Sequence, residues 1–420
     1  MIRRLPAALL SLFVTTGTLA ATSTCQFEQV PVGAQKLGSW IDKNNWLAIE
    51  NQRLTLQAAE VFMPTWRLTP ASNGQAVAIK QRSIDNFQVI DPLDGSRRDL
   101  GFLLDSRLYA DGLVVLRNGR VVTERYRNGL TPDRPRLLLE ATRPLLNVLG
   151  AISVSQGKLA PDKSVIRYLP SLATSTGLRK MSIQRLLENE ERPAWEPEEL
   201  DAWRQASGWI TNHAGNSIRT WLSQSGRWNR PVTEREAPVF GTSPDDDLLA
   251  WTLAESNAMP LARLFCEQLL SRTNPEHPAL WVSDAQGTEL ASGLGLSLRD
   301  FAKLGQLLVE ARSSRSRAKI PGWFIETLVA SSGIRSTEIK GLLKGSEQRY
   351  GFVHLGGAQN RVALIGAHGT SLYIDFDKRL VIAFYATRPG EITPETLALL
   401  EQVWKAIDRA IALPEKGGNP

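Results

Sequence analysis

Strand-like segments near both ends of the chain, separated by a long helical stretch, restrict the possible fold more than any other feature. Residues 111–126 contain two β-rich runs on either side of Asn118-Gly119, the dipeptide most typical of a tight hairpin. Strand character returns in residues 361–387, where Asp377-Lys378 separates the last two runs. We therefore expect both chain ends to form one antiparallel sheet, flanked by helices and standing beside an all-helical lobe. A ligand cleft would lie between the two lobes.

Several segments carry the periodicity and the capping residues of helices. The pattern is helical over about residues 145–159, and Pro144 is a suitable first residue. The run Ser243-Pro244-Asp245-Asp246-Asp247 predicts a helix start, because serine caps the first turn and acids favour its positive end. Apolar spacing predicts two further amphipathic helices, residues 297–311 and 394–412.

Composition and charge place the chain among ordinary globular proteins. Its 420 residues are 42% hydrophobic and 22% charged, which suits one two-lobed domain with a small extension, or two domains. The net charge of +6 comes from basic residues that are scattered along the sequence. A nucleic-acid-binding protein would show these residues clustered in a stripe or a run, so we exclude that class.

The first 21 residues have the features of an export signal. Two arginines precede the apolar stretch Leu5–Val14, and the small residues in Thr18–Ala21 suit a signal peptidase. This stretch is too short to span a membrane, and no second stretch approaches spanning length. Cys25 could mark a lipoprotein, but the residue three positions before it is not the expected leucine. We therefore expect cleavage after residues 1–21 and a soluble protein that is periplasmic or secreted.

Two cysteines, Cys25 and Cys266, remain after that cleavage. An isolated pair in an oxidising compartment predicts a disulfide, which would tie the mature N-terminus to the main domain. The alternative is that Cys266, inside an apolar run, is a buried small hydrophobic residue. The two cysteines and four dispersed histidines show no metal-ligand spacing, so we predict neither a metal site nor a cofactor.

Four strings follow one another along the chain in a family's characteristic order. They are GLVVLRNGRVVTERYRNGLTPDRP, QGKLAPDKSVIRYLPSL, EHPALWVSDAQGTELASGLGLSLRDFAKLGQLL and IGAHGTSLYIDFDKRLVIAF. In these strings, which lie within residues 45–412, the chain resembles the β-lactamase-related serine hydrolases, especially class C β-lactamases and 6-aminohexanoate-dimer hydrolases. The resemblance implies a mixed α/β (α+β) protein with the penicillin-binding, serine β-lactamase-like fold.

The resemblance and the strand pattern together divide the chain into three parts. Residues 1–21 are the predicted signal peptide, residues 22–105 an N-terminal extension without an assigned role, and residues 106–415 the β-lactamase-related domain. The domain divides further into a sheet lobe, residues 106–139 and 341–415, and a helical lobe, residues 140–340.

Members of this family transfer acyl groups with a Ser-x-x-Lys motif at the start of the helix after the first hairpin. The spacing places the lysine amine one helical turn from the serine hydroxyl, where the amine takes its proton. A gapless count between Pro135 and Gly157 puts Glu140 at the serine position and Arg143 at the lysine position, both facing the cleft. An arginine stays protonated, and a carboxylate is a poor nucleophile here. The simpler interpretation of Glu140 and Arg143 is a solvated ion pair near a helix start.

The family's tyrosine motif also lacks its catalytic side chain, whereas its third motif, a Lys-Thr-Gly or His-Gly-like triplet, has a counterpart in this chain. The catalytic tyrosine falls on Gly241, which has no side chain to move a proton, and Ser243 is most simply a helix N-cap. His368-Gly369-Thr370 stands where the family has a Lys-Thr-Gly-like triplet on the strand that lines the cleft. The backbone of such a strand can still hydrogen-bond a ligand after the catalytic side chains are lost.

Tryptophan is dense in one part of the predicted helical lobe. The residues are Trp195, Trp203, Trp209, Trp221 and Trp228. Aromatic side chains beside a cleft can stack on sugars or acyl chains, but the simpler interpretation is that these pack the lobe itself.

Two functions compete for this sequence. The first is that of a pseudoenzyme, which binds a small molecule, peptide, glycan or protein partner in the cell envelope. The second is hydrolysis of amide or ester bonds by relocated residues, with Thr370 or Ser371 as nucleophile and His368 as base, because alternate residues of a strand share a face. An inert scaffold would differ from the first only in lacking a ligand. The sequence assigns neither the ligand nor an oligomeric state.

Overall fold

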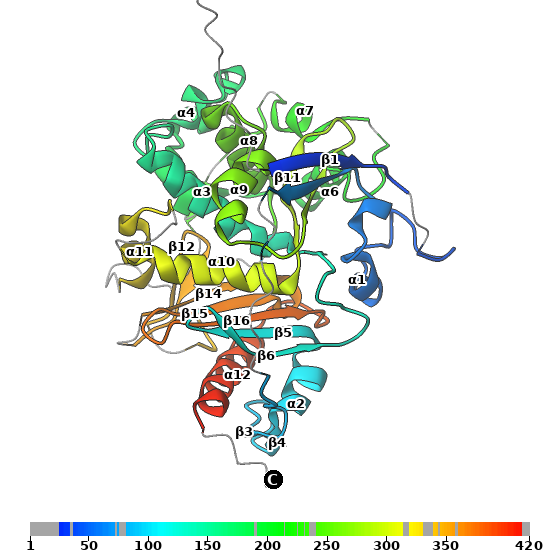
Figure 1. Cartoon of the computed structure of the whole chain (residues 1–420). Coiled ribbons are helices and arrows are strands. Elements are labelled where there is room, and N and C mark those ends of the chain that lie inside the picture. Colours follow the sequence, from blue (N-terminus) through cyan, green and yellow to red (C-terminus); the bar gives the residue numbers. More distant parts are fainter. Residues whose placement is uncertain are drawn as a thin grey trace, which may run out of the picture.

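The computed structural model describes most of the chain, and Figure 1 shows how its elements are arranged. The described residues are 25–33, 37–71, 74, 81–188, 191–213, 215–224, 226–230, 232–234, 241–313, 319–330, 339–342, 345–357 and 360–413. The predicted signal peptide, residues 1–21, lies outside this part of the chain. Among the helices that are described, none is long and apolar enough to cross a membrane.

The main antiparallel sheet is built from both ends of the chain, as the sequence predicts. Within the described residues it has seven strands, in the order β12-β13-β14-β15-β16-β5-β6. Their bounds are β5 (Ala110–Arg117), β6 (Arg120–Tyr126), β12 (Glu347–Arg349), β13 (Phe352–His354), β14 (Arg361–Ile365), β15 (Ser371–Asp375) and β16 (Leu380–Ala386). Asn118 and Gly119 join β5 to β6 with φ values of 52° and 75°, as a two-residue hairpin of this type requires.

Helices make up most of the remaining regular secondary structure that is described. The α-helices are α1 (Ile49–Thr55), α2 (Leu100–Phe102), α3 (Arg143–Ser155), α4 (Thr176–Lys180), α5 (Ile183–Glu188), α6 (Pro197–Ala206), α7 (Ile218–Leu222), α8 (Pro244–Asn257), α9 (Leu261–Gln268), α10 (Leu298–Ala311), α11 (Gly322–Val329) and α12 (Pro394–Ala412). Short turns of other helix types include η2 (Leu103–Arg107), η3 (Leu139–Thr142) and η7 (Ala367–Gly369). The helices predicted after Ser243, Ser297 and Thr393 are confirmed.

Helices cover both faces of the main sheet because its strands send apolar side chains alternately into two cores (Figure 1). Along β5, Val114 belongs to the core shared with the helical lobe, whereas Val115 belongs to the core under α12. On the first of these faces, α10 approaches the sheet closely at Gly305. A Cβ atom at this glycine would come within 2.7 Å of the Val381 side chain.

The lobe predicted to be all-helical also contains strands, which corrects that part of the prediction. Within the described residues, a second antiparallel sheet has the order β1-β2-β10-β11-β7. Its strands are β1 (Cys25–Val30), β2 (Thr65–Pro70), β7 (Arg136–Leu137), β10 (Ala279–Ser283) and β11 (Glu289–Leu296). Because β10 and nearly all of β11 are buried on both faces, their residues lack the alternation that reveals a half-exposed strand. The N-terminal extension supplies β1 and β2, so it forms part of this lobe.

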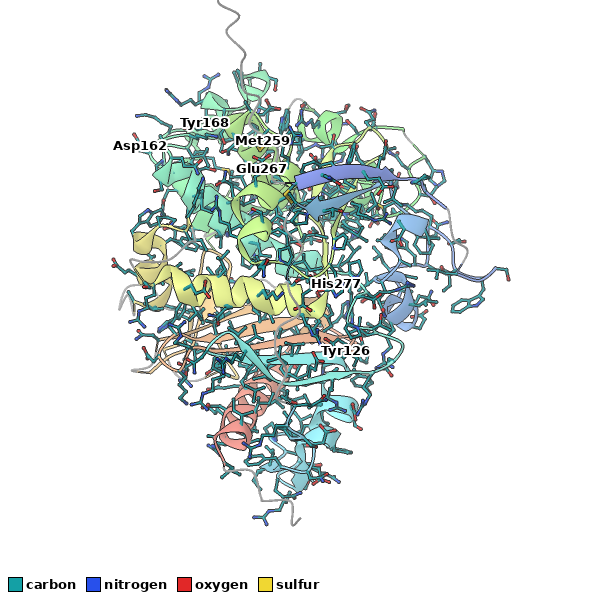
Figure 2. The ribbon with its side chains drawn as sticks, in the orientation of Figure 1. Tyr126, Asp162, Tyr168, Met259, Glu267 and His277 are labelled. Carbon is teal, nitrogen blue, oxygen red and sulfur yellow. A yellow bond between two sulfur atoms is a disulfide. The ribbon has the colours of Figure 1, made fainter. Side chains whose placement is uncertain are left out.

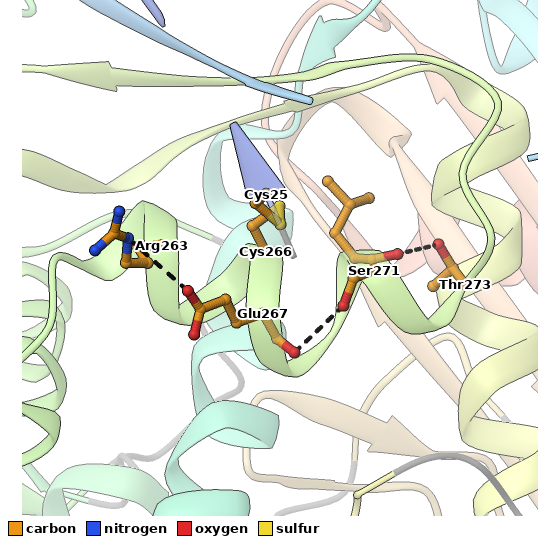
Figure 3. The surroundings of a disulfide bond; sticks show 7 residues. Cys25, Arg263, Cys266, Glu267, Ser271 and Thr273 are labelled. Atoms are coloured by element: carbon orange, nitrogen blue, oxygen red, sulfur yellow. Dashed lines mark hydrogen bonds and ion pairs between the residues drawn. A yellow bond between two sulfur atoms is a disulfide. The ribbon is translucent and has the colours of Figure 1, made fainter. Parts of the chain in front are cut away.

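A disulfide joins Cys25 on β1 to Cys266 on α9 (Figure 3). The two Cα atoms are 6.3 Å apart, within the range that a disulfide can bridge. The two residues are 241 positions apart in the sequence, and both are buried. The bond therefore fastens the first described strand to the helical lobe.

We expect the oxidised, denatured protein to show no free thiol, because the chain's two cysteines are joined to each other. Thiol titration in denaturant checks this result, and titration after reduction should find two thiols. Reduction should also lower the melting temperature, because the unfolded chain then gains conformational freedom. A variant with Cys25→Ala and Cys266→Ala is the control, since its melting temperature should not respond to reductant. Two thiols in the untreated protein would contradict the pairing.

Candidate functional site

Backbone contacts with two other segments fix the chain just before Glu140. The N–H of Leu137 donates to the carbonyl oxygen of Leu56 at 2.9 Å, and the N–H of Leu138 donates to β11 at 2.8 Å. Leu139 then adopts a φ of 49°, a left-handed conformation that is strained in a residue with a bulky side chain. This strained step leads directly into η3, which carries Glu140.

Glu140 and Arg143 lie at the junction of the two lobes. Glu140 belongs to η3, and Arg143 is the first residue of α3, one residue before Pro144. The helix thus begins close to the predicted position. Glu140 faces the turn η7 of the sheet lobe, and Arg143 contacts α5 and α8 of the helical lobe.

Glu140 is half-buried, and one oxygen of its carboxyl group is enclosed by its surroundings. Its Oε2 atom is buried and has no hydrogen-bond partner among the described residues. Burial raises the pKa of Glu140 to about 7, the backbone N–H groups of Glu140 and Ala367 lower it in part, and the charge of Asp246 raises it. Gly366 allows η7 to come this close, because a Cβ atom there would lie 3.0 Å from the Cβ atom of Ala141. The two backbone N–H groups therefore lie near the carboxyl group and favour its charged form, while Oε2 stays without a hydrogen bond.

Arg143 is held by the helical lobe and does not pair with Glu140. Its Nη1 atom lies 3.0 Å from Oδ1 of Asp246, and its Nη2 atom donates to the carbonyl oxygen of Leu186 on α5. The side chains of Arg143 and Asp246 are 8% and 3% exposed, so this ion pair is buried. The interpretation of Glu140 and Arg143 as a solvated ion pair is wrong, because α8 supplies the carboxylate for Arg143.

The start of α8 positions that carboxylate. Ser243 and Asp246 form a capping box, in which the N–H of Ser243 donates to Oδ2 of Asp246 at 2.9 Å. The N-cap role predicted for Ser243 is therefore confirmed. Gly241 is exposed two residues earlier and adds no side chain to the site. Asp246 thus serves both as helix cap and as the partner of Arg143.

The tryptophans pack the helical lobe, as the simpler interpretation predicts. Each of the following is at most 5% exposed: Trp203, Trp209, Trp221 and Trp228. The indole of Trp195 donates to Asp245 at 3.0 Å, and the indole of Trp203 donates to Asp247 at 2.8 Å. Burial raises the pKa of Asp247 to about 7. The acids that begin α8 therefore face inward, toward aromatic donors.

His368-Gly369-Thr370 does not lie on a strand, which corrects the prediction. Strand β14 ends at Ile365, the triplet follows in and just after η7, and β15 begins at the buried Ser371. His368 has a φ of 59°, so the chain turns here, as glycines on both sides of this segment favour. Beside Glu140, it is the backbone of Gly366-Ala367 that takes the place expected for the triplet.

The ring nitrogens of His368 contact a backbone carbonyl and a glutamine side chain, and in the described part of the chain neither contacts a hydroxyl that could act as a nucleophile. Its Nδ1 atom lies 2.9 Å from the carbonyl oxygen of Arg388, and its Nε2 atom lies 3.3 Å from Nε2 of Gln52 on α1. Burial lowers the pKa of His368. The hydroxyl of Thr370 contacts the backbone of Ala386 at 3.4 Å. Because these residues lie in a turn, the argument that His368 and Thr370 share a strand face no longer holds.

Three residues near the site were not among the candidate site residues that the sequence indicates. Ala367 contributes only its backbone, so no side-chain pattern could mark it. Asp246 has the pattern of a helix-start acid, which does not reveal its long-range pairing with Arg143. Gln52 lies in the N-terminal extension, for which the sequence assigns no role, although its contact with His368 brings α1 beside η7.

The chemistry available at the junction is that of one acid and one permanent cation. Glu140 can gain or lose a proton near neutral pH, whereas Arg143 keeps its charge and can only donate hydrogen bonds. In the part of the chain that the structure describes, no group of three or more His, Cys, Asp or Glu side chains could hold a metal ion.

Comparison with known proteins gives the same fold. The Beta-lactamase family model matches residues 102–402. The chain is 23% identical over 313 residues to a 6-aminohexanoate-dimer hydrolase from Paenarthrobacter ureafaciens, covering 72% of this chain and 78% of the relative. A solved structure described as a 6-aminohexanoate-dimer hydrolase from Bacillus anthracis has a TM-score of 0.73 at 21% identity, covering 90% of this chain and 98% of the other. A class C beta-lactamase has a TM-score of 0.52 at 15% identity, covering 76% and 95%.

The likeness to the solved structures shows the shared fold, with its antiparallel sheet beside a largely helical lobe. The family model covers well over half of the sequence and includes both Glu140 and Arg143. The chain therefore belongs to the beta-lactamase-related serine hydrolase family.

Proposed function

We propose that this protein is an exported family member that does not transfer acyl groups and instead binds a ligand or partner in the cell envelope. One observation carries the proposal: the carboxyl group of Glu140, which the count along the sequence puts at the nucleophile's position, lies near the backbone N–H groups of Glu140 and Ala367. Arg143, which the same count puts at the position of the base, is held in a buried ion pair with Asp246.

Acyl transfer by a serine hydrolase requires an activated nucleophile and donors that stabilise the developing oxyanion. Here the carboxylate itself lies against two backbone donors, where it competes with any substrate oxygen. Arg143 stays protonated and cannot take a proton, and Gly241 has no side chain to relay one. Since three separate contributions are missing, restoring one of them should not restore the reaction.

The ligand proposed for the lobe junction is a small molecule, a peptide or a glycan, and nucleic acid is excluded by the scattered basic residues. Export is supported by the arginines and apolar run within residues 1–21. The Cys25–Cys266 disulfide also supports it, because disulfides persist in oxidising compartments such as the periplasm.

We expect no covalent adduct with labelled penicillin or with a fluorophosphonate, and no hydrolysis of simple esters above background. Both reagents detect a serine oxygen that a neighbouring base activates. Intact-mass spectrometry after treatment checks the result, and a class C beta-lactamase treated in parallel shows that the probes are active. A stoichiometric adduct on any serine or threonine would overturn the proposal and favour relocated chemistry.

The Glu140→Ser variant should also stay unlabelled, because its hydroxyl would lie near a permanently charged Arg143. Adding Arg143→Lys should give little more, since the carboxylate of Asp246 would keep the lysine ammonium charged. Gly241 would still supply no proton relay in either variant. Labelling of the single variant at the rate of the control enzyme would contradict this account of the site.

The second candidate is an active hydrolase of amide or ester bonds, as the names of the similar proteins suggest. The pKa of Glu140, about 7, favours it, because a general base works best near the operating pH. Linear amides are the substrates to compare in wild type and Glu140→Gln. Turnover by wild type that Glu140→Gln abolishes would establish this candidate, whereas no turnover by either protein supports the first.

A further inference from the structure

A surface pocket between the N-terminal extension and the first hairpin lies outside the candidate site. Its volume is about 420 Å³. The side chains that line it are Arg53, Asp105, Ser106, Tyr109, Arg127 and Asn128. Tyr126, labelled in Figure 2, ends β6, and the chain then turns to present Arg127 and Asn128 to the pocket. Arg53 belongs to α1, the helix whose Gln52 contacts His368.

The buried carboxylate of Asp111 contacts two of the side chains that line this pocket. Asp111 is 1% exposed and lies where β5 shifts register against β16, a β-bulge of the kind that redirects a side chain beside functional sites. Its Oδ1 atom lies 3.0 Å from Nε of Arg53 and accepts a hydrogen bond from Nδ2 of Asn128 at 2.8 Å. Two of the lining side chains are therefore fixed before any ligand arrives.

The ion pair leaves the outer end of the Arg53 guanidinium free for a ligand. Only Nε faces Asp111, the side chain is 39% exposed, and no described residue hydrogen-bonds Nη1 or Nη2. The guanidinium also lies over the ring of Tyr109, with its central carbon 6.0 Å from the ring centre. Arg53 is thus oriented by contacts with Asp111 and Tyr109, while its side chain stays 39% exposed in the lining of the pocket.

Tyr109 is held in a strained conformation at the edge of the pocket. Its φ is 54° and the residue is 37% exposed, and aromatic residues rarely adopt this left-handed conformation. Its carbonyl oxygen accepts a hydrogen bond from the N–H of Thr387 at 3.1 Å, which fixes the backbone. The preceding turn η2, which carries Asp105 and Ser106, is π-helical. Strained residues and π-turns both concentrate at functional sites.

The charge around the pocket favours an anion. The charged side chains that line it are Arg53, Arg127 and Asp105. One positive charge is therefore in excess among these three groups. Both oxygens of Asp105 lie 2.7 Å from Nη2 of Arg125. The Arg127 side chain is 49% exposed, its Nη1 atom donates to the carbonyl oxygen of Tyr126 at 3.2 Å, and its Nη2 atom lies 3.8 Å from Asp85. Arg53 and Arg127 are thus the exposed cations of the pocket.

We propose that this pocket binds a carboxylate carried on a ring, as in a uronic acid or an aromatic acid. The forked N–H groups of Arg53 and Arg127 match the two oxygens of a carboxylate. The exposed ring of Tyr109 offers an apolar surface to the ligand's ring, and Ser106 and Asn128 can hydrogen-bond its substituents. The proposal is independent of the chemistry at the lobe junction, and it gives the N-terminal extension a binding role.

Calorimetric titration of the mature protein at low ionic strength tests the proposal. The probes are glucuronate and benzoate, with glucose and benzyl alcohol as uncharged counterparts and inorganic phosphate as an anion without a ring. We expect at least one carboxylate to bind about tenfold or more tightly than its uncharged counterpart and than phosphate. Glucuronate and benzoate distinguish a sugar acid from an aromatic acid. Equal binding of all anions, or no carboxylate binding at concentrations on the order of 10 mM, would overturn the proposal.

Tyr109→Gly separates binding from folding. Glycine tolerates the left-handed conformation, so this variant should melt no lower than wild type, while its affinity for the better carboxylate falls about threefold to tenfold. Arg127→Gln, which leaves Asp111 and its partners intact, should weaken binding about tenfold. Arg409→Gln, an exposed arginine on α12, is the matched control and should change neither property.

Two results with these variants would overturn the proposal. If Tyr109→Gly lowers the melting temperature and leaves affinity unchanged, the ring has a structural role and the proposal fails. Unchanged affinity in Arg127→Gln would overturn it as well. Because these titrations use unlabelled protein, adduct formation with penicillin would refute the proposed function without affecting this inference.

Discussion

Replacing Asp111 with alanine is expected to lower the free energy of unfolding by about 3–5 kcal/mol, the cost of leaving a buried charge unpaired. The partner left without its carboxylate is Arg136, whose side chain is 1% exposed and whose Nη1 atom lies 2.7 Å from Oδ2 of Asp111. The donors of Asn128 and Thr387 lose their acceptor at the same time, and Arg53 loses its ion-pair partner. The loss of stability should be large because all these groups contact the two buried carboxylate oxygens of Asp111.

Denaturant unfolding with the disulfide intact measures this loss. Arg136→Met should cost less than Asp111→Ala, because Asp111 would keep its hydrogen bonds from Asn128 and Thr387 and its ion pair with Arg53. The double variant should be more stable than the sum of the two single losses predicts, since it removes both members of the buried pair. A loss below about 1 kcal/mol in Asp111→Ala would show that the network around Asp111 contributes little to stability.

Replacing Glu140 with glutamine is expected to stabilise the protein at pH 8 by about 2–3 kcal/mol and to have no such effect at pH 4. Folding raises the pKa of Glu140 from 4.5 to about 7 because the carboxylate loses solvation. Between these values the unfolded chain releases its proton while the folded protein keeps it, so stability falls as the pH rises. Above the folded pKa the whole penalty is present, and glutamine, which never ionises, avoids it.

The free energy of unfolding of both proteins, measured from pH 4 to pH 8.5, checks this expectation through their difference. Asp247 is the necessary comparison, because burial also raises its pKa to about 7. Its ionisation therefore changes the free energy of unfolding over the same pH range. Asp247→Asn should remove its own part of the slope, and the double variant should show the flattest profile. A constant difference between wild type and Glu140→Gln across this range would contradict the enclosure of the carboxylate.

Much of the fold was predictable because the features that specify it are local. Asn118-Gly119 sets a turn through its own two residues, and Ser243 caps a helix through neighbours three positions away. The position of Glu140 and Arg143 at the start of α3 also follows from the sequence, since landmarks on both sides fix the count. Family membership was recognisable for the same reason, because its strings keep their order along the chain.

The surroundings of those residues were decided by the tertiary structure alone. Strands β10 and β11 were missed because burial on both faces removes the alternation by which a strand is recognised. The triplet at His368 was placed on a strand because its turn depends on how η7 packs against η3.

Contacts between residues that are far apart in the sequence were also decided by the tertiary structure. Arg143 lies 103 positions before Asp246, and Gln52 lies 316 positions before His368, so no local pattern could link them. The sequence determined which groups are present at the start of α3, an acid and an arginine at the positions where our count predicts the family's serine and lysine. Packing determined their partners, because a buried charge requires an opposite charge or a hydrogen-bond donor within reach, and only the folded chain brings one there.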